Sequence, residues 1–470
     1  MRNSKLYSIL TQFDKYEQNR LRKFLVSPYF NRSEAIVTLF DYLLMHINAA
    51  REDEIPKETL WMQMVPDAPY DDVRFRKYCS DLFKLVQDYL AAEVYESKPA
   101  GKALLLMEAV SKRKLERIRS TAIRNVHKFT EQNTLRSADF YLDQYLFEKN
   151  YYELHKHDRT SKTNIERINK NLDGFYISEK LRYYCLSLGQ RKVADHTYHI
   201  EFMDEIIRYV QDKDFPDVPS IPVYYQILLM ETDGENLEHY FKLKQLLEQN
   251  GLKFPREEAE SMYGFAFNYC VSKINQGNPQ FQNELFDLYK DSLKKEIIIV
   301  EGELSPWDFR NITTIALRLG QYDWTEEFIK TYQHALPEAF RQNSVNYNLA
   351  QVYFYQKKYG EVIQLLQEVE FEDFTYNLNS KSILLATYYE TDEIEPLYSL
   401  FESFRTYLNR HKDIPSSRRQ LYANLIRFTK KITNLTPGDR KAVQKLKQEL
   451  EATKNVASHS WLMEKIAELE

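Results

Sequence analysis

Hydrophobic residues recur with a helical period along nearly the whole chain. One apolar face follows the spacing i, i+3, i+4 and i+7, which predicts an amphipathic helix: Ile36, Leu39, Phe40, Leu43 and Ile47. A second set repeats the first at an offset of 43 residues: Cys79, Leu82, Phe83, Val86 and Leu90. We therefore predict two copies of one helical unit near the N-terminus. The only β-like run, residues 296–300, is too short and isolated to predict a sheet.

Clusters of Pro, Gly, Ser and Asn interrupt the helical pattern and indicate where the elements begin and end. The sequence Ser-Pro-Trp-Asp at 305–308 predicts a helix start, with Ser at the N-cap and Pro at the first helical position. Three prolines fall within 215–222, and we take this stretch as the main boundary. The predicted domains are an N-terminal helical region (1–215), a helical repeat array (216–408) and a basic C-terminal helical cap (409–470).

An internal repeat with a period of 35 residues is present in the second half of the chain. Six positions of one copy are matched 35 residues later by the apolar or aromatic positions of the next: 349, 350, 353, 359, 362 and 366. An earlier copy begins at Ile312, at an offset of 37. Two antiparallel helices of about 14 residues with their turns account for this period. The register predicts that six side chains are buried between helices: Leu349, Tyr353, Leu366, Leu384, Tyr388 and Phe401.

The segment NLAQVYFYQKKYGEVIQLLQEV resembles the tetratricopeptide repeat family, and the resemblance covers about residues 305–407. Leu349, Ala350 and Tyr353 match the first helix of the family pattern, and Tyr359 matches the turn, whereas Val362 replaces the usual alanine. The resemblance implies an all-α fold in which antiparallel helical hairpins stack into an α-solenoid, a superhelix with a concave surface.

In that family the first helix of each pair lines the concave face. Transferring the inward positions gives a candidate groove for a partner protein or peptide: Trp307, Arg310, Asn311, Arg318, Tyr347, Asn348, Gln351, Tyr355, Asn379, Ser382 and Tyr389. The same positions also include Thr314, Phe354 and Ile383. Only Arg310 and Asn348 match the clamp with which one subgroup binds a terminal carboxylate, so the resemblance does not imply such a ligand. The alternative is that Trp307, Tyr347 and Tyr355 simply pack against a neighbouring helix.

Two further resemblances concern the N-terminal region. The stretches FLVSPYFN and LWMQMVPDAPYDDVRFRKYCSDLFKLVQDYL resemble an uncharacterised family of bacterial helical-repeat proteins, which implies no activity. The second stretch is also similar to the helix-turn-helix of winged-helix regulators, in which Arg74, Arg76 and Lys77 would open the recognition helix. Winged helices need strands before this motif and a hairpin after it, whereas the pattern here is helical in both places.

Composition excludes several classes of protein. Gly is only 11 of 470 residues and Pro 15, which disfavours sheet-rich folds with many tight turns. No run approaches 18 apolar residues, and the N-terminus lacks the apolar core of a signal peptide, so neither a membrane span nor a leader is expected. The three cysteines have no paired spacing, which fits reduced thiols and a cytoplasmic location.

Charge is distributed unevenly along the chain, whose formal net charge is −5. Residues 201–400 carry 17 Lys and Arg against 34 Asp and Glu, whereas the flanking segments are mildly basic. Two basic runs, 112–136 and 405–447, are either solvated helix faces or surfaces that bind an anionic partner such as nucleic acid.

Signals for catalysis are poor, because the chain has no phosphate-binding glycine loop and no nucleophile elbow. His196 and His199 could share a helix face and hold a metal, but no third ligand is evident. We therefore expect no enzyme, no cofactor, no metal and no small-molecule substrate. The expected function is a non-catalytic scaffold or adaptor for protein–protein interaction. The alternatives are a nucleic-acid-associated regulator that uses the basic runs, and an enzyme whose site has no known pattern.

Overall fold

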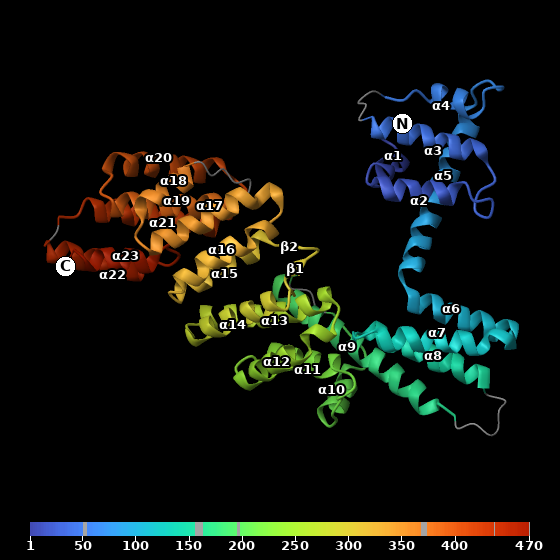
Figure 1. Ribbon diagram of the computed structural model, residues 1–470. Coiled ribbons are helices and arrows are strands. Elements are labelled where there is room, and N and C mark those ends of the chain that lie inside the picture. Colours follow the sequence, from blue (N-terminus) through green and yellow to red (C-terminus); the bar gives the residue numbers. More distant parts are fainter. Residues whose placement is uncertain (50–53, 156–162, 195–197, 368–373, 437, 470) are drawn as a thin grey trace. The chain divides into compact units, whose positions relative to one another are not determined.

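The computed structural model describes residues 1–49, 54–155, 163–194, 198–367, 374–436 and 438–469. Most of these residues are helical and only four lie in strands, which confirms the predicted all-α class (Figure 1). None of the described helices combines the length and the apolar character needed to cross a membrane. The chain divides into two compact units, the first formed by 1–134 and 138–176 and the second by 135–137 and 177–470.

Unit 1 is built from α1 to α8 and the beginning of α9 (Ile165–Ala194), which continues into unit 2: α1 (Lys5–Leu10), α2 (Lys15–Leu25), α3 (Glu34–Asn48), α4 (Lys57–Met64), α5 (Asp72–Ser97), α6 (Pro99–Arg113), α7 (Glu116–Gln132) and α8 (Ala138–His155). One buried cluster joins α1 to α5, and a second joins α6 to α8. The two predicted copies lie on α3 and α5, which contact each other. Phe40 and Val86 are fully buried there, whereas Leu90 is exposed.

Unit 2 contains the remaining helices: α10 (Met203–Gln211), α11 (Ser220–Thr232), α12 (Leu237–Asn250), α13 (Arg256–Asn275), α14 (Gln280–Lys294), α15 (Pro306–Arg318), α16 (Tyr322–Tyr332), α17 (Glu338–Tyr355), α18 (Tyr359–Gln367), α19 (Phe374–Glu390), α20 (Ile394–Arg410), α21 (Ser416–Thr433), α22 (Arg440–Ala452) and α23 (His459–Ala467). Short 3₁₀ turns follow α12 (η1, Gly251–Lys253) and α16 (η2, Gln333–Ala335). Along this unit α15 contacts α17, α17 contacts α19, and α19 contacts α21.

The β-like run forms a small hairpin, so the expectation that it makes no sheet is wrong. Strand β1 (Ile299–Val300) pairs antiparallel with β2 (Glu303–Leu304), and Ile299 lies opposite Leu304. Glu301 and Gly302 form the loop with φ of 52° and 86°. Two successive positive φ values are the geometry of a type I′ turn, which closes a two-residue hairpin even between strands this short.

The sequence repeat coincides with a repeated turn between paired helices. A residue with left-handed backbone follows the first helix of three successive pairs: Gly320, Lys357 and Asp392. In each pair, the N–H of the next residue donates to a carbonyl five residues earlier, at 2.9, 2.8 and 3.0 Å. This bond is the signature of the Schellman motif, which satisfies the last carbonyls of a helix. The offsets between the turns, 37 and 35 residues, are those of the sequence repeat.

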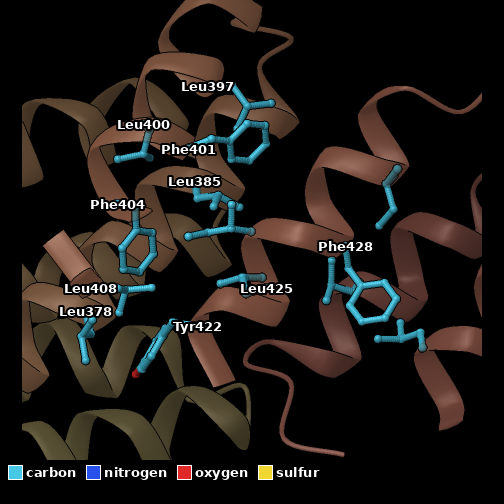
Figure 2. Packing of buried hydrophobic residues seen from close by; sticks show 14 of the residues in the cluster. Leu378, Leu385, Leu397, Leu400, Phe401, Phe404, Leu408, Tyr422, Leu425 and Phe428 are labelled. Carbon is cyan, nitrogen blue, oxygen red and sulfur yellow. The ribbon is translucent and has the colours of Figure 1, made fainter. Parts of the chain in front are cut away.

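The helices α19 to α23 share one hydrophobic core, in which Phe401, Phe404, Leu425 and Phe428 are fully buried (Figure 2). Residues of the predicted cap at 409–470 therefore pack against the last predicted repeat rather than forming a core of their own. Helix α21 contacts α19 and α20, α23 contacts α21, and α22 contacts α23, so the apolar residues of all five helices join in one cluster.

The proline-rich stretch at 215–222 does not coincide with the division between the units. Pro219 is the N-cap residue of α11, and Pro222 lies in the first turn of that helix, so two of the three prolines belong to a helix start. Helix α9 packs across the predicted boundary, because the hydroxyls of Ser178 and Ser220 lie 2.7 Å apart and the Cys185 thiol donates to the Tyr224 carbonyl. The division falls instead within α9, at residue 176.

Of the six side chains expected in the repeat core, Leu366 and Phe401 are buried. Three others are partly buried and pack against the clusters around them: Tyr353, Leu384 and Tyr388. Leu349 is partly buried.

Candidate binding groove

A cavity of about 900 Å³ lies in unit 2 against α15, α17, α19 and α21, the first helices of successive pairs. Eight of the eleven residues expected in a groove line it: Arg310, Asn311, Arg318, Tyr347, Gln351, Tyr355, Asn379 and Ser382. Thr314, Phe354 and Ile383 line it as well. Side chains that are spread over about 70 residues of the sequence, from Arg310 to Ser382, therefore line the same cavity.

Three expected groove residues do not line the cavity. Asn348 is fully buried, and its amide donates to the Ser344 carbonyl at 2.7 Å, so its side chain stays within the helix packing. Trp307 packs against Tyr376, with ring centroids 5.6 Å apart. Tyr389 meets Trp461 edge to face at 5.5 Å. The packing alternative, which named Trp307, Tyr347 and Tyr355, therefore describes the contact of Trp307, and it also describes Tyr347, which lines the cavity but is buried against Tyr376.

Arg310 is the most constrained cation of the groove. Its guanidinium carbon lies 4.7 Å from the ring centroid of Trp307 and 5.3 Å from that of Tyr376, so two aromatic faces hold it. The Tyr376 hydroxyl donates to the Pro306 carbonyl at 2.9 Å, which fixes this ring against the start of α15. The Nη1 atom of Arg310 is buried and has no hydrogen-bond partner among the described residues.

Two contacts position side chains on the part of the lining formed by α17 and α19. Tyr347 is buried against Tyr376, at 5.2 Å between ring centroids, and this burial raises the pKa of its hydroxyl. The Tyr422 hydroxyl donates to the Asn379 side-chain oxygen at 2.7 Å and joins α19 to α21. These bonds hold aromatic rings and amides in fixed positions at the cavity surface.

A further part of the lining comes from the C-terminal part of the chain, which sequence reasoning missed. Leu421 and Tyr422 of α21 line the cavity together with residues 457–461 at the start of α23. Two bonds hold this segment: the Ala457 N–H donates to the Leu421 carbonyl at 3.2 Å, and the Trp461 indole donates to Glu390 at 2.7 Å. The docking of this segment on α19 and α21 is a long-range contact with no local signal in the sequence.

The described residues that line the cavity include two arginines and one histidine but no carboxylate. Neither Arg310 nor Arg318 forms an ion pair within the described part of the chain. This composition contrasts with the surrounding sequence, because residues 201–400 contain twice as many acidic as basic residues.

The basic run 405–447 contributes to a separate, shallow hollow on α20, α21 and α22. Five cations line it: Arg405, Arg427, Lys430, Lys431 and Lys445. Lys431 pairs with Glu449 at 2.6 Å, and Arg405 pairs with Glu402 at 3.3 Å, so part of this charge is neutralised. The other basic run, 112–136, lies on α6 and α7.

Two other expected sites are the histidine pair and the helix-turn-helix of the N-terminal region. His196 lies outside the described residues, and no group of three His, Cys, Asp or Glu within them is placed to hold a metal ion. Arg74 packs over the Trp61 ring at 5.6 Å, and Arg76 pairs with Asp72 at 2.6 Å. The described residues of unit 1 contain no strand that would complete a winged helix.

Comparison of the chain with protein-family models, with curated proteins and with solved structures found no match.

Proposed function

We propose that this protein is a non-catalytic scaffold whose helical pairs stack in a tetratricopeptide-like α-solenoid and bind a peptide segment of a partner protein. The observation that carries the proposal is the cavity lined by four successive first helices, α15, α17, α19 and α21. A surface built from the same position of repeated units presents similar chemistry at regular intervals, which suits an extended ligand.

The chemistry of the lining supports a peptide ligand. Asn311 and Gln351 supply hydrogen-bond donors and acceptors that match a peptide backbone. Phe354, Tyr355 and Tyr422 supply aromatic surface for side chains. Aromatic rings combined with amide groups are the composition of protein-binding interfaces rather than of an acid–base catalytic site.

The experiment is the selection of peptides from an unbiased random display library on the full-length protein, followed by affinity measurement. The groove variant carries Asn311→Ala, Gln351→Ala and Tyr355→Ala, because these side chains line the cavity without being buried in the core. The control is Phe340→Ala, an exposed aromatic of α17 that does not line the cavity.

We expect the groove variant to bind the selected peptides at least ten-fold more weakly, with its melting temperature close to that of the control. Failure of the library to yield any binder, or equal affinity in the groove variant, would overturn the proposed function.

A further inference from the structure

We propose that the groove selects acidic peptide segments, with Arg310 and Arg318 receiving two carboxylates that are four residues apart in an extended ligand. This inference rests on the proposed function and specifies its ligand. The carboxylates are side chains within a segment, since the residues that would clamp a chain terminus are largely absent from the lining.

Charge complementarity is the first argument. The described lining holds two guanidinium groups without ion-pair partners and contains no carboxylate. Some cations on other helices of unit 2 do have such partners, as Lys244 pairs with Glu284 at 2.7 Å and Lys295 with Asp291 at 2.8 Å. An acidic ligand would supply the partners that the groove cations lack.

The state of Arg310 is the second argument. Its Nη1 atom is buried and lacks a hydrogen-bond acceptor among the described residues, while Trp307 and Tyr376 fix the orientation of the guanidinium plane. A buried donor without an acceptor is costly, by about 1–3 kcal/mol. A carboxylate matches the fork of the guanidinium and would form a charge-assisted hydrogen bond with those of its N–H groups that face the cavity.

The spacing of the two arginines defines the ligand further. Arg310 and Arg318 are eight residues apart on α15, and Thr314 lies midway between them on the same wall. Eight residues of helix rise by about 12 Å. In an extended peptide, side chains on one face that are four residues apart are separated by about 13 Å. The rise along α15 therefore matches acidic residues at positions i and i+4 of a ligand that runs along this helix.

The start of α23 adds positive potential to the lining. Residues 458–461 line the cavity, and the N-cap Ser458 makes no side-chain hydrogen bond to the first turn. The first N–H groups of a helix carry partial positive charge, which favours an anion. His459 in the same turn also lines the cavity.

A peptide fits better than a nucleic acid because the segment that supplies most of the groove residues is acidic overall. Residues 201–400 carry a net charge of −17, the difference between 17 basic and 34 acidic residues. A phosphate backbone is charged at every nucleotide and would be repelled along its whole length. A short peptide places only two charges, each beside an arginine.

The test uses the full-length protein and two fluorescein-labelled peptide libraries of ten residues. In one library glutamate is fixed at two positions four apart, in the other glutamine is fixed there, and all other positions are randomised among uncharged residues. The variants are Arg310→Gln with Arg318→Gln in the groove, and Arg405→Gln with Arg427→Gln in the basic hollow as the matched control. Fluorescence anisotropy is measured at 50 and 150 mM salt, and circular dichroism checks that each variant folds.

We expect the glutamate library to bind at least ten-fold more tightly than the glutamine library. The groove double variant should lose this difference, and the control should keep it. Equal binding of both libraries would show that the groove does not select acidic peptides, while the proposed peptide-binding function would still hold. If the random display library yielded no binder at all, the proposed function itself would be wrong. Displacement of the glutamate peptides by a 20-nucleotide DNA strand at both salt concentrations would assign the groove to nucleic acid and overturn the proposal.

Discussion

At the scale of single residues, the turn of each helical pair depends on one backbone position. Gly320 adopts φ of 70° there, and the equivalent Lys357 and Asp392 adopt 59° and 55°. A side chain in this conformation costs roughly 1–2 kcal/mol, which glycine avoids. The array therefore tolerates non-glycine residues at two of its turns because the Schellman bonds and the packing of the helices compensate.

Gly320→Ala is expected to lower the free energy of unfolding by about 1–2 kcal/mol, because alanine is strained at this positive φ although no atom obstructs its Cβ. The control is Gly264→Ala within α13, where the added Cβ also meets no atom within 4 Å. There, alanine favours the helix and should raise the free energy of unfolding by about 0.5–1 kcal/mol. Urea denaturation measures both, and a shift of the same sign in the two variants would contradict the assignment of the turn.

A second residue-scale feature is Asp308 in the first turn of α15. Burial raises its pKa to about 6, and the nearby charge of Glu260 adds to this shift. The folded protein therefore holds the proton between about pH 4 and 6, where the unfolded chain has released it. Since the native state binds more protons in this window, the free energy of unfolding falls as pH rises through it.

Asp308→Asn is expected to stabilise the protein by about 2 kcal/mol at pH 7 and to have little effect below pH 4, because asparagine removes the cost of the buried charge. Thermal melts from pH 4 to 8 measure the difference. Asp323→Asn serves as control, since this exposed carboxylate occupies the first turn of α16 and should give no such gain at neutral pH. An advantage of Asp308→Asn that does not change with pH would show that the carboxyl is not buried as a charge.

At the scale of elements, the paired helices were predictable because their signals are local. The spacing of apolar residues defined α17 to α20, and Ser305 at the start of α15 accepts a hydrogen bond from the Trp307 N–H as the N-cap pattern predicts. The turn at Glu301 and Gly302 was missed because two-residue strands have no period to detect. Burial was predicted less well: Leu349 lies in the right helix but remains partly exposed, since the outcome depends on what the neighbouring helix presents.

The packing between paired helices is tested at Leu366, which is buried with Tyr347, Val362 and Tyr376 in one small cluster. Leu366→Ala is expected to lower the free energy of unfolding by about 2–5 kcal/mol, through lost apolar burial and the cavity left behind. The exposed Leu252 provides the control, and Leu252→Ala should change stability by less than about 0.5 kcal/mol. If Leu366→Ala left the denaturation midpoint unchanged, the assignment of buried positions in the 35-residue repeat would be wrong.

At the scale of the whole molecule, the candidate groove shows where sequence reasoning reaches its limit. Positions on α15, α17 and α19 could be placed on one face because a repeat transfers geometry from one copy to the next. The positions of Trp461 and Tyr422 could not be predicted in this way. They reach the cavity through contacts between segments more than 30 residues apart, such as the bond from the Trp461 indole to Glu390. Part of the cavity lining thus depends on the C-terminal helices, which the repeat pattern does not cover.

This dependence makes a prediction about the C-terminal helices. A chain that ends after Arg410 loses α21, α22 and α23, and with them the partners of Leu385, Phe401 and Phe404 in the shared core. Without these partners the apolar residues of α19 and α20 become exposed, and their burial no longer stabilises the two helices. We therefore expect α19 and α20 to lose their protection from amide hydrogen exchange, while α11 to α14 keep theirs. Hydrogen exchange with mass spectrometry compares the shortened and full-length chains helix by helix. If α19 and α20 kept full protection, residues 409–470 would be a separate cap, and the cavity would have to be formed without the part of its lining that they supply.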